Sequence, residues 1–176
     1  MQPQNITALI ETIAAISSDL TLDEFTQRIT RFIGAAGCLI FRFQPENESL
    51  VVLADYMSPP IQTAFDVGSI GMVYPLTHYP ALVQVRQAQT LCIISIDDPT
   101  TIETEKELLH ARQCREAVII PMVCQTRTIG ALSLFLNNQD GFTQEQERFC
   151  RVLANQAAVA IDSYLHESRH HQVLRS

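Results

Sequence analysis

Six aromatic, imidazole and guanidinium side chains in the middle of the chain could bind a small molecule. They are Tyr74, His78, Tyr79, Arg86, His110 and Arg112. Aromatic rings stack on planar groups, and arginine and histidine bind anions, so the set would suit a planar or anionic ligand. These residue types are also common on protein surfaces, and a solvent-exposed position remains the alternative for each of them.

Five cysteines supply the candidate thiol chemistry. Their odd number, their wide spacing and the lack of a CxxC or Cys/His metal pattern predict free thiols in a reducing compartment. Cysteines in apolar runs are predicted to be core residues. These are Cys38, Cys92, Cys124 and Cys150. Cys114 lies between Arg112 and Arg115, whose charges would lower the pKa of a nearby thiol, so Cys114 is a candidate redox-sensing residue.

A third candidate is the sequence His-Glu-Ser-Arg-His at residues 166–170, which matches the zinc-protease pattern HExxH. On a helix this spacing places both histidines on one face. The histidine that follows is the immediate neighbour His171, and the end of a helix offers no water-excluding cleft for a catalytic metal. We interpret this segment as a solvated helix end and predict no metal site.

The N-terminal third of the chain shows two helical patterns. In residues 5–17 an apolar stripe has the spacing of a coiled-coil seam. Its members are Ile6, Leu9, Ile13 and Ile16. A second helix is predicted after Thr21, because Thr21 and Glu24 form a capping-box pattern, and glycines at 34 and 37 should end it.

The remainder of the chain reads as strands and helices around an irregular centre. Branched and aromatic residues predict strands at 38–43, 50–56, 116–124 and 127–136. The irregular region, residues 57–101, includes a short helix at 79–87 and a short strand at 91–94, and a helix follows at 101–112. A last helix is predicted after Thr143, which has Gln146 in the capping-box position. Its apolar stripe includes Phe149, Val152 and Leu153.

The runs at 116–124 and 127–136 do not alternate apolar with polar residues, which indicates strands that are covered on both faces. Tight turns between neighbouring strands predict antiparallel pairing. The expected fold is therefore α+β: a central antiparallel sheet of five to six strands, with the terminal helices on one face and loops and short helices over a pocket on the other.

Composition narrows the functional classes. The chain has 176 residues, 47% of them hydrophobic, and a net charge of −7, which favour one folded domain and exclude a disordered chain. No basic cluster suited to nucleic acid is present. The N-terminus lacks the pattern of a secretory signal, and no apolar run has the length of a membrane span. We expect a cytoplasmic protein that binds neither nucleic acid nor membrane.

Three segments resemble a GAF domain, the small sensory module of bacterial and eukaryotic signalling proteins. They are the hairpin AVIIPMVCQTRTIGALSLFLN, the helix start FTQEQERF and the helical segment ANQAAVAID. The resemblance covers residues 20–165, with an N-terminal assembly helix at 1–19 and the end of a signalling helix at 166–176. It implies a dimer interface on the terminal helices and a ligand pocket beneath residues 58–112. The related PAS fold is the structural alternative.

The special chemistries of this family are not supported by the matching positions. The cysteine and histidine that attach a bilin align with Thr104 and Glu105, so no covalent bilin and no other identifiable cofactor is expected. The cyclic-nucleotide pattern has Asn138 and Gln146 in place of its lysine and aspartate. The catalytic loop of free methionine sulfoxide reductase has Ile70 at the cysteine position.

We therefore expect a non-enzymatic module that senses a small molecule of unknown identity and forms a homodimer through its terminal helices. The dimer residues would be Ile6, Leu9, Ile13, Ile16, Phe149, Val152 and Leu153. An output domain would lie in a longer chain or in a partner protein. A ligand-free dimerisation scaffold and a thiol-dependent sulfoxide reductase are the alternatives.

Overall fold

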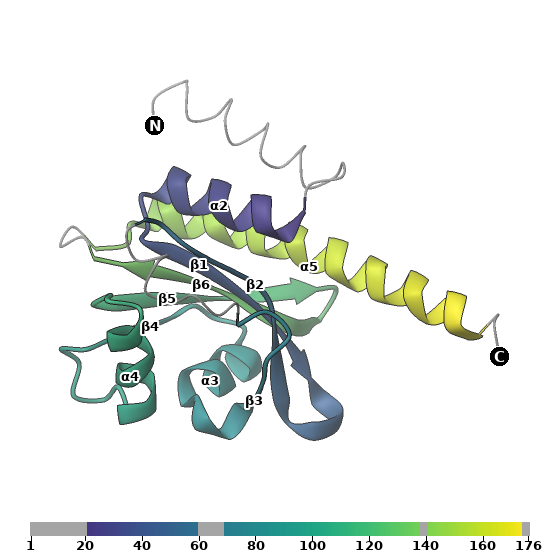
Figure 1. Ribbon diagram of the computed structural model, residues 1–176, viewed down its shortest axis with the longest axis horizontal. Coiled ribbons are helices and arrows are strands. Elements are labelled where there is room, and N and C mark those ends of the chain that lie inside the picture. Colours follow the sequence, from purple (N-terminus) through teal and green to yellow (C-terminus); the bar gives the residue numbers. More distant parts are fainter. Residues whose placement is uncertain (1–20, 60–68, 138–140, 174–176) are drawn as a thin grey trace.

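The computed structural model describes residues 21–59, 69–137 and 141–173, with side chains as far as residue 164 (Figure 1). The helices are α2 (Leu22–Ile33), α3 (Pro80–Ala88), α4 (Glu103–Ala111) and α5 (Gln144–Val173), with 3-10 turns η1 (Pro45–Asn47) and η3 (Leu76–His78). The strands are β1 (Gly37–Gln44), β2 (Ser49–Met57), β3 (Val73–Pro75), β4 (Cys92–Ser95), β5 (Glu116–Cys124) and β6 (Arg127–Leu136). The N-terminal stripe Ile6, Leu9, Ile13 and Ile16 lies outside the described residues.

The six strands form one antiparallel sheet in the order β3-β2-β1-β6-β5-β4. The predicted α+β class and the strand number are confirmed, and β5 and β6 have the predicted bounds. Strand β3 was not predicted. It has three residues at the sheet edge, two of them exposed, so it lacks the apolar run that identifies a buried strand.

Helices α2 and α5 lie side by side on one face of the sheet (Figure 1). Alternate strand residues point to this face and join the helices in one apolar core. The strand side of this core includes Ile40, Ala54, Ile120, Met122, Leu132 and Leu134. From the helices, Phe25, Ile29, Leu153 and Ala157 fill the space between the layers. This arrangement confirms the prediction that the two helices share a face.

Helices α3 and α4 lie on the opposite side of the sheet (Figure 1). The other set of alternating strand residues forms a second core with them. This set includes Leu39, Phe41, Val52, Ile119, Ala131 and Phe135, which pack against Leu82, Val85 and Leu109. Burial on both faces explains why β5 and β6 are mostly apolar and do not alternate apolar with polar residues.

The predicted helix starts are present in the structure. Thr21 and Glu24 form the reciprocal capping box of α2, and Thr143 and Gln146 exchange the same pair of hydrogen bonds before α5. Gly34 ends α2 in the left-handed conformation at φ 74°. No helix in the described segments is long and apolar enough to cross a lipid bilayer.

Strands β1 and β6 pair along only part of their length. Their last paired residues are Arg42 and Gly130, after which β1 continues with β2 and β6 continues with β5. Register irregularities lie close to this point, between Ile40 and Phe41 in one hairpin and between Met122 and Val123 in the other. Because β-bulges bend and twist strands, the two hairpins diverge here and the sheet is split at this end.

Candidate ligand site beneath helices α3 and α4

The space between the sheet and helices α3 and α4 is almost filled by side chains. One cavity of about 80 Å³ is lined by Leu39, Phe41, Tyr74, Tyr79, Leu82 and Arg112, among others. A second space of about 10 Å³ shares Phe41, Tyr79 and Leu82 with it. Sites for small organic ligands usually measure roughly 300–1,000 Å³. The described side chains therefore leave room for little more than water.

A buried ion pair closes one end of this cavity. Arg112, which follows α4, donates from Nη1 to Oδ1 of Asp55 at 2.7 Å and from Nη2 to Oδ2 at 2.8 Å. The hydroxyl of Ser69 also donates to Asp55, and the guanidinium lies 4.6 Å from the ring centre of Phe135. The two charged side chains are only 8% and 16% exposed. Arg112 is thus committed to a structural contact between α4 and β2.

The environment of Asp55 keeps it ionised. Burial acts to raise the pKa of Asp55, but the hydrogen bonds and charge of Arg112 and the hydroxyl of Ser69 together hold it below its ordinary value. A lowered pKa stabilises the fold above the unfolded-state pKa of about 4, and this contribution disappears as the pH falls through the folded-state pKa.

We expect the stability difference between the wild type and Asp55→Asn to depend on pH. The difference in free energy of unfolding should be constant near neutral pH. It should shrink as the pH falls from about 4 through the lower folded-state pKa, because Asp55 is protonated in both states only below that pKa. Urea unfolding at a series of pH values measures it. A difference that stays the same down to the acid limit would show that the Asp55 charge does not stabilise the fold.

Helices α3 and α4 are tied together by polar contacts. Glu105 is buried, and its Oε1 accepts a hydrogen bond of 2.8 Å from the backbone N–H of Ala81 in the first turn of α3. A carboxylate at this place also suits the positive end of the helix dipole. The hydroxyl of Thr104 donates to the carbonyl of His78 at 2.8 Å. The two positions that align with bilin attachment therefore hold structural contacts.

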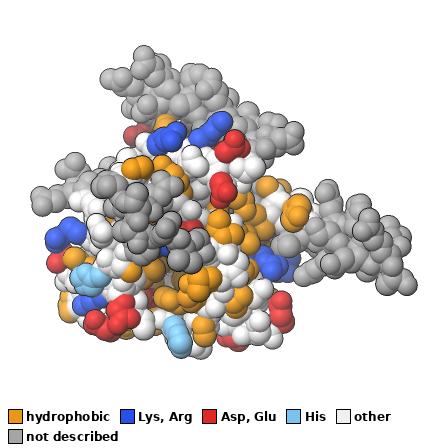
Figure 2. Space-filling model, in the orientation of Figure 1, with side chains coloured by type: hydrophobic (Ala, Val, Ile, Leu, Met, Phe, Trp, Pro, Cys, Tyr) orange, Lys and Arg blue, Asp and Glu red, His pale blue; other side chains and the backbone are white. Residues whose placement is uncertain are grey.

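The structure brings three of the six predicted ligand residues together. Tyr74, Tyr79 and Arg112 line the same cavity, and the two tyrosine rings meet edge to face at 6.3 Å. His78 and His110 are exposed, and histidine side chains are visible on the lower surface in Figure 2. Arg86 lies in a separate groove at the split end of the sheet.

Sequence reasoning missed Asp55, Ser69 and Glu105. A signal was available for Asp55, because it is a charged residue inside the apolar strand β2, and buried charges need partners. Glu105 entered the sequence analysis only as the residue at the bilin-attachment histidine position, and the structure shows that its carboxylate bonds to the start of α3. Nothing in the sequence pattern around Ser69 distinguishes it from a loop residue.

The thiol of Cys114 is buried, and burial raises its pKa to about 11, although Arg112 acts in the opposite direction. The sequence-based expectation of a lowered pKa was wrong. Arg112 is paired with Asp55, and the guanidinium of Arg115 pairs with Asp97. Burial likewise raises the pKa of every other cysteine of the chain, and each has a free thiol.

Two of the α5 residues predicted for a dimer interface lie inside the domain. Phe149 packs against Phe32 with 4.4 Å between ring centres, and Leu153 is fully buried. Val152 is 46% exposed. Within the residues that the structure describes, no cluster of three or more His, Cys, Asp or Glu side chains could hold a metal. The side chains of the segment 166–170 lie outside this description.

Several solved structures have a similar fold. The GAF domain of a phosphoenolpyruvate-protein phosphotransferase from Coxiella burnetii has a TM-score of 0.76 and 15% identity, over 94% of this chain and 96% of its own. The GAF domain of the Acinetobacter phosphoenolpyruvate-protein phosphotransferase has a TM-score of 0.72 and 16% identity, over 96% of this chain and 99% of its own. The phycoerythrobilin-bound GAF domain of a cyanobacterial phytochrome has a TM-score of 0.69 and 18% identity, over 95% of this chain and 100% of its own.

Identities this low show a shared fold. A search of the curated proteins finds no match to the chain. The family model for the GAF domain matches residues 18–161, which is most of the chain and includes every strand and helix described above except the end of α5. The chain therefore belongs to the GAF domain family, whose members are signalling and sensory modules.

Proposed function

We propose that this chain is a non-enzymatic regulatory module of a bacterial-type signalling protein. In this proposal it pairs with a second copy through its helical layer, and the space beneath α3 and α4 is a structural core. The observation that carries the proposal is the small volume left in that space. Its two inner cavities measure about 80 Å³ and about 10 Å³, and a third, between the starts of α3 and α4 and strand β4, measures about 140 Å³. The small volume favours the ligand-free scaffold over the ligand sensor for this part of the fold.

Opening this core for a ligand would be costly. A ligand of ordinary size would have to displace the rings of Tyr74 and Tyr79 and separate Arg112 from Asp55. Breaking a buried charge pair leaves each charge without compensation in a low-dielectric environment. For this reason the proposal does not include a bilin ligand like the phycoerythrobilin of the cyanobacterial phytochrome domain.

The state of the thiols supports a non-catalytic role. Sulfoxide reduction requires a thiolate nucleophile, and burial acts against thiolate formation at each cysteine. Ile70, at the position of the family's catalytic cysteine, is 50% exposed and has no nucleophilic atom. Cys114 is therefore not proposed as a redox site.

The surface of α5 supports the pairing. Val152 and Val159 lie seven residues apart on one face of the helix and are 46% and 51% exposed. Tyr164, further along, is 70% exposed. In a two-fold dimer this stripe would meet its own copy, and the predicted seam of residues 6–16 has the matching coiled-coil spacing. The helix also extends beyond the sheet (Figure 1), where it can contact a partner helix.

We expect the wild type to be a dimer by light scattering after size-exclusion chromatography and Val159→Glu to be a monomer, because the charge would be buried at the centre of the interface. Val73→Glu is the matched control: Val73 is 53% exposed on strand β3, away from α5, and this variant should remain dimeric. A wild-type monomer at high concentration, or equal dissociation in both variants, would overturn the pairing.

A further inference from the structure

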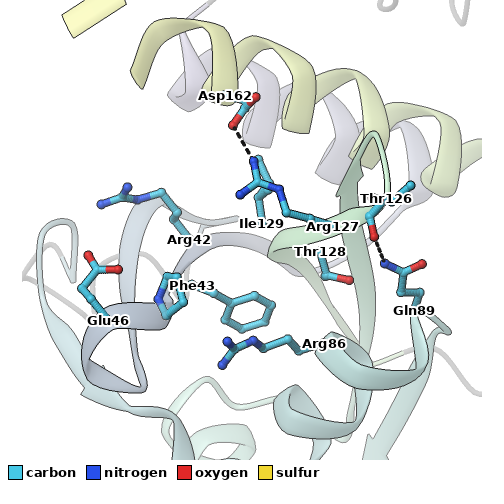
Figure 3. A pocket seen from close by; sticks show the side chains of 11 residues that line it. Arg42, Phe43, Glu46, Arg86, Gln89, Thr126, Arg127, Thr128, Ile129 and Asp162 are labelled. Carbon is cyan, nitrogen blue, oxygen red and sulfur yellow. Dashed lines mark hydrogen bonds and ion pairs between the residues drawn. The ribbon is translucent and has the colours of Figure 1, made fainter. Parts of the chain in front are cut away.

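A groove of about 530 Å³ lies at the split end of the sheet (Figure 3). It lies where the β1–β2 and β5–β6 hairpins diverge beyond the pair Arg42 and Gly130. Helix α3 closes another side, since Gln89 Nε2 donates to the carbonyl of Thr126 at 2.9 Å. This volume falls within the usual range for small organic ligands.

Three arginines from three elements line this groove: Arg42 from β1, Arg86 from α3 and Arg127 from β6 (Figure 3). Two carboxylates, Glu46 and Asp162, also line the groove. Its lining therefore has more positive than negative side chains, in a chain whose net charge is −7. The guanidinium group presents a planar fork of donors that matches the oxygens of phosphate.

Arg86 and Arg127 make only long ion pairs within the protein. The shortest nitrogen–oxygen distance is 3.9 Å both between Arg86 and Glu48 and between Arg127 and Asp162. The corresponding distance is 2.7 Å between Arg112 and Asp55 and 2.9 Å between Arg151 and Glu147. These long separations leave donors available for another acceptor.

Two buried polar atoms in this groove have no hydrogen-bond partner among the described residues. They are Nε of Arg42 and Oγ1 of Thr128. Arg42 also makes no ion pair with any described carboxylate. Leaving buried donors unpaired is unfavourable, and a bound acceptor would relieve this cost only if the two side chains turned toward the groove, because both atoms are closed off from solvent.

The groove also has an apolar part that an inorganic ion would not use. The ring of Phe43 lies at its centre in Figure 3, with Pro45 and Ile129 also among the lining residues. The Arg86 guanidinium is 5.8 Å from the centre of that ring. A ligand that combines a phosphate with an apolar or ring-shaped body would engage both kinds of surface.

We propose that this groove binds a small organic phosphate, with Arg42, Arg86 and Arg127 holding the phosphate and the body of the ligand lying on Phe43. The site is separate from the closed core beneath α3 and α4 and does not depend on dimer formation. The groove reaches α5 through Asp162, which faces Arg127 of β6 at 3.9 Å and also accepts from the thiol of Cys124 at 3.7 Å. A phosphate on Arg127 would therefore compete with a contact of the helix.

Isothermal titration calorimetry at fixed ionic strength, with phenyl phosphate and inorganic phosphate as probes, tests the proposal. We expect saturable one-to-one binding of both, with phenyl phosphate the tighter. Arg42→Gln and Arg127→Gln should each weaken binding at least about tenfold, because each removes charge-assisted hydrogen bonds. Arg127 is 68% exposed, so its variant should fold even if Arg42→Gln does not. Arg148→Gln, an exposed arginine of α5, makes the same change in net charge outside the groove and should bind normally.

Four results would overturn the proposal. Absence of saturable binding would exclude the site, and equal losses in Arg127→Gln and Arg148→Gln would show that only net charge matters. Equal affinity for the two probes would remove the role of Phe43 and leave a simple anion site. Binding of a phosphoserine peptide without binding of phenyl phosphate would indicate a phosphoprotein partner in place of a small molecule.

Discussion

Replacing Arg112 with methionine is expected to lower the free energy of unfolding by about 3 kcal/mol, the lower end for breaking a buried pair, since Asp55 keeps some contact with solvent. The substitution would leave the Asp55 carboxylate in a low-dielectric environment with the Ser69 hydroxyl as its remaining described donor. It would also remove the contact of the guanidinium with the Phe135 ring at 4.6 Å. Urea unfolding at neutral pH measures the loss.

Two further variants separate the charge pair from simple loss of packing. Adding Asp55→Asn to Arg112→Met should give a double variant whose loss is smaller than the sum of the two single losses, since the two residues interact directly. Arg148→Met, at an exposed position of α5, should change stability by less than about 0.5 kcal/mol. If Arg112→Met behaved like Arg148→Met, the pair would not hold the α4 side of the domain to β2.

Gly130→Ala is expected to lower the free energy of unfolding by about 3 kcal/mol or more, at least as much as Arg112→Met. A Cβ atom at this position would lie 2.0 Å from the carbonyl oxygen of Phe41 and 3.2 Å from the Cα of Arg42. Both are backbone atoms of β1, so the clash cannot be relieved by a side-chain rotation. Strands β1 and β6 would have to separate at their last paired residues, in the centre of the sheet. Thermal or urea unfolding measures the effect.

Gly34→Ala is the matched control for this prediction. A Cβ at Gly34 would meet nothing within 4 Å, but the residue has φ 74°, so its substitution should cost about 1–2 kcal/mol from backbone strain alone. Gly130 requires the absence of a side chain, and Gly34 requires a left-handed backbone. A loss at Gly130 no larger than that at Gly34 would mean that the sheet adjusts easily at this point.

The sequence predicted the parts of the fold that depend on local pattern. The continuous apolar runs of β5 and β6 gave their bounds, and the capping pairs of Thr21 and Thr143 gave the starts of α2 and α5. Strand β3 could not be predicted, because its pairing with the start of β2 is a tertiary contact and its own residues are mostly exposed.

The candidate site depends on contacts between residues far apart in the chain, and these were not predictable. Arg112 was identified as a polar residue that could face a ligand, but its partner Asp55 lies 57 residues earlier. Arg86 was assigned to the same pocket, yet the end of α3 places it in the groove with Arg42, which is 44 positions away. The sheet bulges that create this groove have no distinct sequence pattern.

Native mass spectrometry of freshly purified protein tests the central proposal most directly, because it reports subunit number and retained ligand together. The account predicts a mass of two chains with no organic molecule held beneath α3 and α4. A weakly bound phosphate that is lost in Arg42→Gln would be consistent with the groove. A monomer, or a stoichiometric organic ligand that Arg42→Gln retains, would contradict the account.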